Sequence, residues 1–385
     1  MADNTLTGLI PTIYEAMDIV AKKMVGFIPA VYKNSSVARA AVGETIRYPI
    51  VPDITLAAGS ASLYPVENGE ATISYADMTL SKDYYAPIQI NGEEAKGLAN
   101  SGVGANIMRD RFAKAIRALV DAIEADLATQ YIYASRAVKS TGLYLFDSTD
   151  KLSSLAQLRR ILMDNGAQGE ELQLVLGSSA GALLRSAEFL FKVNEAGSAD
   201  LLRNGAIARL MEFDIHESAQ ISAHTNGTYA NAVCTDIALG DTAMTTTGAV
   251  AASIKAGDLL KIANDVNNVY VSQLVGTGAG TSLTLNAPGS RVVHTGATDA
   301  ITPLIATSYT PNMAFARNAI HLCTRAPAMP DGGDSAVDST MITDPLTGLS
   351  FEVRKYNEHR RVKYEVCCVW GWKTVKPEFV AILAE

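Results

Sequence analysis

The apolar residues near the start of the chain follow two different periods. After Pro11 they recur at helical spacing, at Ile13, Met17, Val20 and Met24. This spacing predicts an amphipathic N-terminal helix. From Thr45 to Ile90 the period falls to two residues around a turn-rich middle, which predicts a long β-hairpin. Because two-stranded hairpins are marginal in water, this one needs a further surface to lie on, and a neighbouring subunit is one candidate.

A long helical stripe follows the hairpin and leads into shorter elements. No proline occurs between residues 103 and 134, and one stripe carries Ile116, Leu119, Val120, Ile123, Leu127 and Tyr131. A single helix over this range has a length of about 45 Å. Further along, the patterns predict a helix at 153–163, a strand at 172–176, a helix at 179–185 and a strand at 213–221.

The composition changes between residues 226 and 307. Gly, Thr, Ala and Asn dominate there, and the apolar residues come in short runs of β character. This change predicts a small all-β insertion with its own core. Its buried side chains are expected to be Leu260, Ile262, Val269, Val271, Leu283 and Leu285.

The last part of the chain reads as a strong hairpin. One strand face is expected to carry Val362, Tyr364, Val366, Cys368, Trp370 and Trp372. Polar residues such as Lys363 and Glu365 alternate with them, and a final strand is expected around Phe379 and Val380. The mixture of separate helices and hairpins predicts an α+β fold.

Composition excludes several classes of protein. The chain has 385 residues, of which 48% are hydrophobic and 19% are charged, so it folds, and its length suggests two or three domains. The net charge of −8, without a basic cluster, argues against tight nucleic-acid binding. No signal peptide is expected, and residues 266–290 are too polar for a membrane span. The four cysteines lack C-x-x-C spacing and are expected to be reduced and buried: Cys234, Cys323, Cys367 and Cys368.

The sharpest enzymatic signal is a G-x-S-x-G sequence at residues 177–181, between a predicted strand and a predicted helix. A serine hydrolase built on Ser179 is therefore one alternative. The simpler interpretation is that Ser178 or Ser179 caps the helix. His359, the last histidine, lies in a predicted turn among basic residues, which is a poor setting for a catalytic base.

Other polar groups give weaker signals. The glycine-rich segment 276–280 lacks the spacing of a phosphate loop and reads as a turn. Asp331, Asp334, Asp338 and Asp344 do not fit a calcium loop and read as a solvated loop. His216, His224 and His294 lack metal-ligand spacing and are expected to be structural. We therefore expect no catalytic, cofactor or metal site.

The order of the elements resembles that of the major capsid proteins of tailed bacteriophages. Within that family it is most similar to the coat proteins of short-tailed phages that carry an inserted β-barrel domain. The residues that carry the resemblance are 6–28, 175–182, 312–319 and 349–356. They are spread along the chain on both sides of the insertion, although none is a chemical motif.

The resemblance implies a division of the chain into named parts. The hairpin becomes the extended loop that overlaps an adjacent subunit, and the long helix becomes the spine of a peripheral domain. The implied parts are an N-terminal arm (1–44), the extended loop (45–90), the peripheral domain with its spine helix (91–150), the axial domain (151–225), the inserted β domain (226–307), the axial return (308–345) and the closing strands of the peripheral domain (346–385).

The resemblance also implies partners and a location. Copies of the chain join into hexamers and pentamers of an icosahedral shell around double-stranded DNA, which is contacted weakly and non-specifically. Since the apolar stripe of the arm starts by Ile13, assembly is expected to need a separate scaffolding protein. A portal protein is a further partner, and whether a decoration protein binds is open. The location is the virion, and the host bacterial cytoplasm during assembly.

Two rival classes stay open at this point. A serine hydrolase would lose activity on Ser179→Ala, and a soluble β-type binding module would stay small in solution. Only the capsid interpretation predicts closed particles or rings. Some relatives cross-link a loop lysine to an asparagine of a neighbour, but residues 53–72 contain no lysine, so no such cross-link is expected here.

Overall fold

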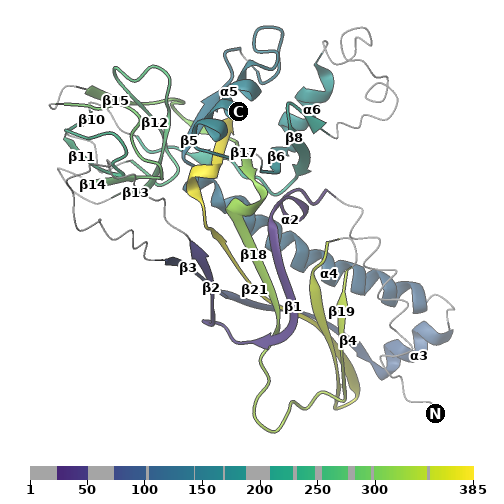
Figure 1. Cartoon of the computed structure of the whole chain (residues 1–385). Coiled ribbons are helices and arrows are strands. Elements are labelled where there is room, and N and C mark those ends of the chain that lie inside the picture. Colours follow the sequence, from purple (N-terminus) through teal and green to yellow (C-terminus); the bar gives the residue numbers. More distant parts are fainter. Residues whose placement is uncertain are drawn as a thin grey trace, which may run out of the picture.

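The computed structural model describes residues 24–50, 73–100, 104–142, 144–167, 170–187, 209–228, 232–247, 254–275, 282–295, 299–344 and 347–385. Within these ranges the strands form two large sheets and two short two-stranded ladders. One large sheet lies with the spine helix in the lower half of Figure 1, and the other occupies the upper half together with the β-rich insertion.

The upper sheet has twelve strands, six of which belong to the body of the chain. These six are β5 (Arg136–Lys139), β6 (Leu172–Gly177), β7 (Arg209–Leu210), β8 (Phe213–Ser218), β17 (Pro311–Ala316) and β22 (Val380–Ala384). Strand β22 lies between β5, which is parallel to it, and β17, which is antiparallel. All five residues of β22 are buried, as expected for a strand that is covered on both faces.

The two faces of this body sheet contact different cores. Val380 and Ile382 point into the core that contains α2 (Phe27–Ala30) and α4 (Gly104–Ala128). Ala381 and Leu383 point into the core formed with α5 (Ser153–Asp164) and α6 (Ser178–Ser186). The alternation of side chains along one strand therefore separates two layers of helices.

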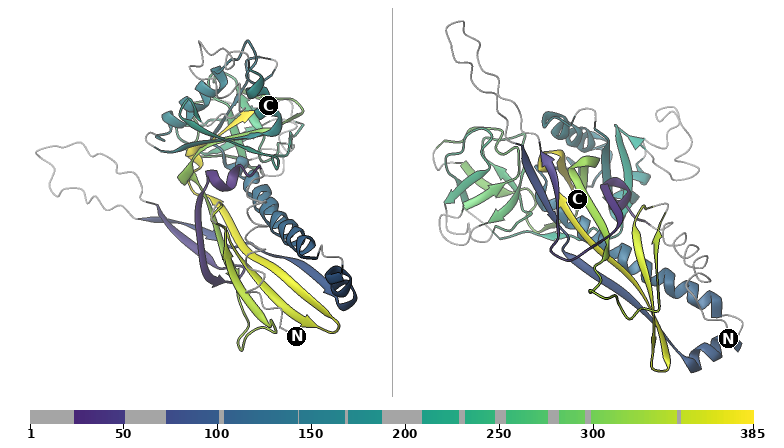
Figure 2. Two further views of the ribbon diagram at one scale, coloured as in Figure 1. Left: turned by 90° about the vertical axis from the view of Figure 1, so that its right-hand side faces the viewer. Right: turned by 60° about the horizontal axis from the view of Figure 1, so that its bottom comes forward.

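The lower sheet has six strands and rests on the spine helix. Its strands are β1 (Tyr32–Ala40), β4 (Lys82–Asn91), β18 (Ile320–Pro327), β19 (Asp338–Thr343), β20 (Ser350–Glu358) and β21 (Arg361–Thr374). Figure 2 shows α4 running along this sheet. Phe112 of α4 meets Tyr364 of β21 edge-on, with ring centroids 5.6 Å apart, and Trp370 is fully buried. The 25 residues of α4 span about 38 Å at helical rise.

The insertion closes into a six-stranded barrel. Its strands are β10 (Ala232–Cys234), β11 (Ala243–Thr247), β12 (Leu259–Ile262), β13 (Tyr270–Val275), β14 (Ser282–Leu285) and β15 (Asp299–Pro303). They follow the order β12-β15-β10-β11-β14-β13, and β13 pairs back with β12. The chain enters and leaves the barrel through a short ladder between β9 (His224–Thr225) and β16 (Ser308–Tyr309).

Most of the expected barrel core is buried, but it is shared with the body. Leu260, Ile262, Leu283 and Leu285 lie in a cluster formed by barrel residues alone. Val271 is buried in the main core, and Val269 is only partly buried and packs against that same core. The expectation of full burial is therefore wrong for Val269, because it lies where the barrel meets the body.

The sequence analysis located several elements within a few residues. Helix α5, strand β6, helix α6 and strand β8 match the predicted ranges. The predicted long helix over 103–134 consists of α4 and a 3-10 helix that follows it, η1 (Thr129–Tyr133). All four cysteines are buried free thiols, as expected. The predicted N-terminal helix over 13–24 and the glycine-rich segment 276–280 lie outside the described residues, except for Met24.

The predicted hairpin over 45–90 needs a correction. Strand β2 (Thr45–Ile50) pairs with β3 (Ser74–Thr79), but β4 pairs with β21 in the lower sheet along its whole length. The hairpin therefore ends at Thr79. The residues of β4 alternate with the same two-residue period as those of β2 and β3, and this period does not reveal which strand is the partner of β4.

The expected ranges 308–345 and 346–385 also differ from the sheets. Within the first, β18 and β19 belong to the lower sheet and only β17 lies in the body half of the upper one. Within the second, β22 returns to the upper sheet. The chain therefore crosses between the two sheets several times, so no single boundary in the sequence separates them. Strand β18 pairs with β21, and both contribute buried side chains to the same core.

Candidate functional site

The β2–β3 hairpin is the first candidate for an interaction surface. Its strands pair from Thr45↔Thr79 to Ile50↔Ser74 and project away from both large sheets (Figure 2). Buried apolar contact is concentrated at the root, where Met78 packs with Cys323 and Val369. Further out, Tyr75 is 58% exposed. The described part of the hairpin is therefore a ladder that the body supports only at one end.

Polar contacts fix the direction in which the hairpin leaves. The Arg47 Nε atom of β2 lies 3.0 Å from Asp77 Oδ1 of β3, and the Arg47 guanidinium lies over the Tyr75 ring. The Lys373 Nζ of β21 donates to the Asp77 carbonyl at 2.8 Å. Arg47 and Asp77 are exposed, so the ion pair between them contributes less than about 1 kcal/mol to stability. The main effect of these contacts is to orient the hairpin.

A histidine joins the hairpin to the first strand of the lower sheet. The His321 ring lies 4.7 Å from the Tyr32 ring of β1 and 4.4 Å from the Tyr48 ring of β2. Its Nε2 pairs with the Asn318 carbonyl at 3.0 Å. Burial lowers the pKa of His321, and the nearby Lys376 acts in the same direction, which favours the neutral imidazole. The ring thus acts as an aromatic spacer between two segments.

A buried glutamate anchors the segment that precedes β1. Glu124, near the C-terminal end of α4, accepts hydrogen bonds from the backbone N–H groups of Gly26, Phe27 and Ile28, at 3.0 and 3.2 Å for the last two. These are the first amides of α2, which lack partners within that helix. Burial raises the pKa of Glu124 to about 7, although the three amides favour the charged form.

At the start of β4, aromatic side chains surround one ordered lysine, Lys82. Lys82 Nζ lies 2.7 Å from Asp126 Oδ1 of α4, and the rings of Tyr84 and Trp372 are within 5.6 Å of the ammonium. The indole N–H of Trp370 donates to the other oxygen of Asp126 at 2.8 Å. Tyr84 is 49% exposed. This cluster presents apolar surface next to the hairpin root.

The G-x-S-x-G segment has a different environment from the one expected. Gly177, not a serine, precedes the first turn of α6, and no side chain caps that turn. Ser179 Oγ donates instead to Glu385 Oε1 at 2.5 Å. The interpretation of Ser178 or Ser179 as the helix cap is therefore wrong, because both serines already lie inside the helix. His359 lies at the other end of the molecule, near α3 (Gly92–Asn100) (Figure 1).

The remaining histidines have carboxylate or amide partners. His216 pairs with Gln173 at 2.9 Å, His224 Nε2 with Asp258 at 2.9 Å, and His294 Nδ1 with Asp299 at 2.6 Å. The expectation of a solvated loop holds for Asp331, which is exposed, but is wrong for Asp344, which is 6% exposed and accepts from Thr347. Asp334 accepts from Tyr356 and Arg354. In the described part of the chain, no group of three His, Cys, Asp or Glu residues could hold a metal ion.

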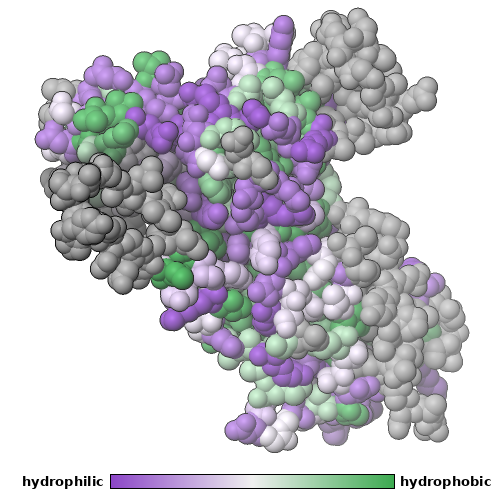
Figure 3. Space-filling view, in the orientation of Figure 1, coloured by the Kyte–Doolittle hydropathy of each residue, from purple (hydrophilic) through white to green (hydrophobic). Residues whose placement is uncertain are grey.

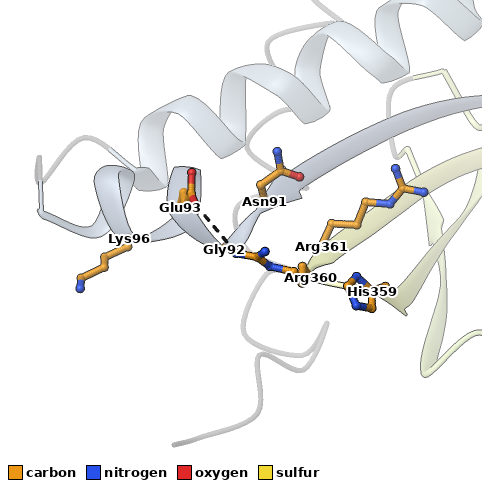
Figure 4. Close-up of a pocket in the computed structure, with 7 residues that line it drawn as sticks. All are labelled: Asn91, Gly92, Glu93, Lys96, His359, Arg360 and Arg361. Carbon is orange, nitrogen blue, oxygen red and sulfur yellow. Dashed lines mark ion pairs between the residues drawn. The ribbon is translucent and has the colours of Figure 1, made fainter.

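An open cleft lies between the start of α3 and the β20–β21 turn (Figure 4). It is lined by Asn91, Gly92, Glu93, Lys96, His359, Arg360 and Arg361. All of these residues are exposed, and the pair between Arg360 and Glu93 is loose, at 3.9 Å. Three cationic side chains, Lys96, Arg360 and Arg361, and one acidic side chain, Glu93, thus line the cleft, in a chain whose net charge is −8.

The surface and the helices add little further chemistry. Polar side chains cover most of the face in Figure 3, with apolar patches between them. Among the helices within the described ranges, none combines the length and the apolar character that a membrane crossing requires.

The sequence analysis missed the contacts that define this region. It assigned no role to Glu124 or Asp126. Their partners, Gly26 and Trp370, lie far away in the sequence. The one available signal was the pair of carboxylates near the C-terminal end of a long amphipathic helix, on the side that the structure buries.

Comparisons with known proteins give structural likeness only. No family model and no curated protein matches the chain. Among solved structures, the chain is similar to one from Mycobacterium phage Che8, with 12% identity, a TM-score of 0.45, and coverage of 96% of this chain and 87% of the other. It is also similar to a chain in the capsid of cyanophage P-SCSP1u, with 10% identity, a TM-score of 0.47, and coverage of 92% and 86%. A chain of a virus-like particle from Pyrococcus furiosus shares 10% identity at a TM-score of 0.41, with coverage of 96% and 97%. At these levels of similarity the likeness does not define what this chain does.

Proposed function

We propose that this chain is the major capsid protein of a tailed bacteriophage, of the short-tailed type with an inserted β-barrel domain. The observation that carries the proposal is the β2–β3 hairpin, whose described strands have buried apolar support only at the root. A two-stranded ladder of this kind is marginal by itself, and the surface of an adjacent copy supplies the missing support. Repeated head-to-tail contacts then close into rings.

The proposal assigns a role to each part of the fold. The body half of the upper sheet, with α5 and α6, corresponds to an axial domain at the centre of hexamers and pentamers. The lower sheet with α4 corresponds to the peripheral domain, and the barrel is an insertion on the outer surface. The partners are further copies, a separate scaffolding protein, a portal protein and weakly contacted double-stranded DNA, with a decoration protein as a further candidate. The proposal includes no catalytic role.

Electron microscopy tests the proposal directly. The chain is expressed with its scaffolding partner, and closed shells or ring-shaped capsomers are expected in the lysate. Tyr75→Asp, on the exposed hairpin, is expected to abolish them while the soluble chain stays folded. Tyr144→Asp is the matched control, because Tyr144 is 60% exposed but lies away from the hairpin. A wild-type chain that remains small under these conditions would refute the proposal.

A further inference from the structure

Apart from the packing of Leu259 and Val271 in the main core, the barrel makes most of its polar contacts with the body at one short segment of the chain. Residues 131–136 begin within η1, the 3-10 helix that follows α4, and reach the first residue of β5. By contrast, the ladder between the barrel and β5 consists of a single residue pair, Tyr270↔Arg136, with one further hydrogen bond from Ala137 N to the Val269 carbonyl. Strand pairing alone therefore holds the barrel weakly.

At one end of this segment, Tyr131 contacts the base of the barrel. The Tyr131 hydroxyl lies 3.0 Å from His224 Nδ1, and the opposite ring nitrogen lies 2.9 Å from Asp258 Oδ1. Asp258 is fully buried and also accepts from the backbone N–H groups of Gly227 and Lys255. Since a buried carboxylate needs its partners, this chain of hydrogen bonds has little freedom to rearrange.

The packing at this contact is equally restrictive. Gly257 has φ of +95°, and a Cβ atom built on it would lie 2.9 Å from the Tyr131 ring and 3.1 Å from the His224 ring. The Tyr309 hydroxyl donates to the Gly257 carbonyl at 2.5 Å. His224 of β9 is thus in direct contact with Tyr131, and Tyr309 of β16 packs against His224 and bonds Gly257.

At the other end of the segment, two amides of the barrel complete the attachment. Asn286 Nδ2 donates to the carbonyls of Ile132 and Ala134 at 2.8 and 2.7 Å. Arg136, which is 2% exposed, donates to Asn268 Oδ1 of the barrel and to Asn165 Oδ1 after α5, both at 2.8 Å. The Ala134 carbonyl is buried, so losing Asn286 removes a hydrogen bond from a group that water does not reach, whereas Arg136 keeps Asn165 and the Ile161 carbonyl if Asn268 is lost.

From these contacts we infer that residues 131–136 form a latch that fixes the orientation of the barrel to the end of the spine helix. Barrel and helix then move as one body, and releasing the latch leaves the barrel held by its apolar contact with the main core, so that it samples a wider range of orientations. The inference goes beyond the proposed function and does not depend on it, because it concerns the single chain in solution.

Electron-spin distance measurements test the latch. Spin labels are placed on Arg117→Cys of α4, where the side chain is 49% exposed, and on Leu239→Cys of the barrel, which is 65% exposed. The four native cysteines are buried and should not react. With the latch intact, a single narrow distance distribution is expected. In the Tyr131→Phe, Asn286→Ala double variant, the width is expected to at least double.

Two controls make the outcome decisive. His216→Gln alters a half-buried histidine of β8 that bonds Gln173 away from the latch, and the distribution should stay narrow. Hydrogen exchange in β14 should stay slow in the latch variant, which shows that the barrel remains folded. An unchanged width in the latch variant overturns the inference. So does unfolding of the barrel, because the segment would then be part of the barrel core rather than a latch.

Discussion

At the residue scale, the buried carboxylates determine how the molecule responds to pH. Glu124 and Glu352 are both 1% exposed, but their surroundings differ. Glu124 meets only backbone amides of α2, so burial dominates and raises its pKa to about 7. Glu352 meets two guanidinium groups: Arg39 contacts both carboxylate oxygens at 2.6 and 3.0 Å, and Arg354 contacts one at 2.8 Å. Burial alone would raise the pKa of Glu352, but these partners hold it below the usual value.

The raised pKa of Glu124 predicts that stability falls as pH rises. Between the usual value of 4.5 and about 7, the folded chain binds a proton that the unfolded chain has released. Integrated over this window, the loss amounts to about 3 kcal/mol. Glu124→Gln should remove this part of the pH dependence, measured as the urea midpoint from pH 4.5 to 8. Asp121→Asn, one turn away, should keep it; an identical slope in the Glu124 variant would contradict the assignment.

The lowered pKa of Glu352 predicts the opposite sign. Its stabilisation is present above the usual value of 4.5 and is lost as pH falls through the lowered folded value. Glu352→Gln removes one of the two carboxylates that pair with the buried Arg354, the other being Asp334, and this should cost about 3–5 kcal/mol at neutral pH in urea unfolding. Glu212→Gln, in an exposed pair with Arg159, is the control and should change stability by less than about 0.5 kcal/mol. A loss that persists unchanged at acid pH would argue against the charge as its cause.

At the element scale, the barrel combines its own core with borrowed support. Leu283 is 1% exposed within the cluster of barrel residues, whereas Val271 of β13 belongs to the main core. The barrel therefore has an apolar core of its own, and some of its side chains are buried only because they pack against the body. This also explains why its polar groups Asn286 and Asp258 have partners outside the barrel strands.

Truncating Leu283 tests the barrel core. Leu283→Ala should cost about 2–5 kcal/mol and should unfold the barrel before the rest of the chain. Hydrogen exchange would show the loss of protection first in β11 and β14, the strands that contain or flank this residue. Leu239→Ala, at a side chain that is 65% exposed, should leave exchange unchanged. Simultaneous loss of protection in α4 would mean that barrel and body unfold as one unit.

The elements that the sequence predicted well are those whose signal is local. Helix α5 and strand β6 follow from apolar spacing within a dozen residues, and the structure places them where expected. The pairing of β4 with β21 joins residues more than two hundred positions apart, for which a period of two contains no information. The same limit explains why Glu124 was missed: its helical position indicated a face, but not that the amides of α2 would occupy it.

At the scale of the whole molecule, Lys82 bears on how a shell would be held together. Its ammonium is engaged by Asp126 at 2.7 Å and lies near the rings of Tyr84 and Trp372. Together with the absence of lysine from residues 53–72, this predicts a shell without covalent cross-links through the hairpin. Boiled particles should give a single monomer band on a denaturing gel. A ladder of larger bands would show that a cross-link forms at another site.

The place of β22 has a consequence for synthesis of the chain. It lies between β5 and β17, yet it follows both of them in the sequence. While the ribosome makes the residues after β17, this strand, which contains Met313 and Phe315, has no partner on the edge that β22 later occupies. This state lasts for a time on the order of seconds. An open, apolar edge in a nascent chain pairs readily with the same edge of another nascent chain. We therefore expect nascent chains to associate through this edge until residues 380–384 pair with β17.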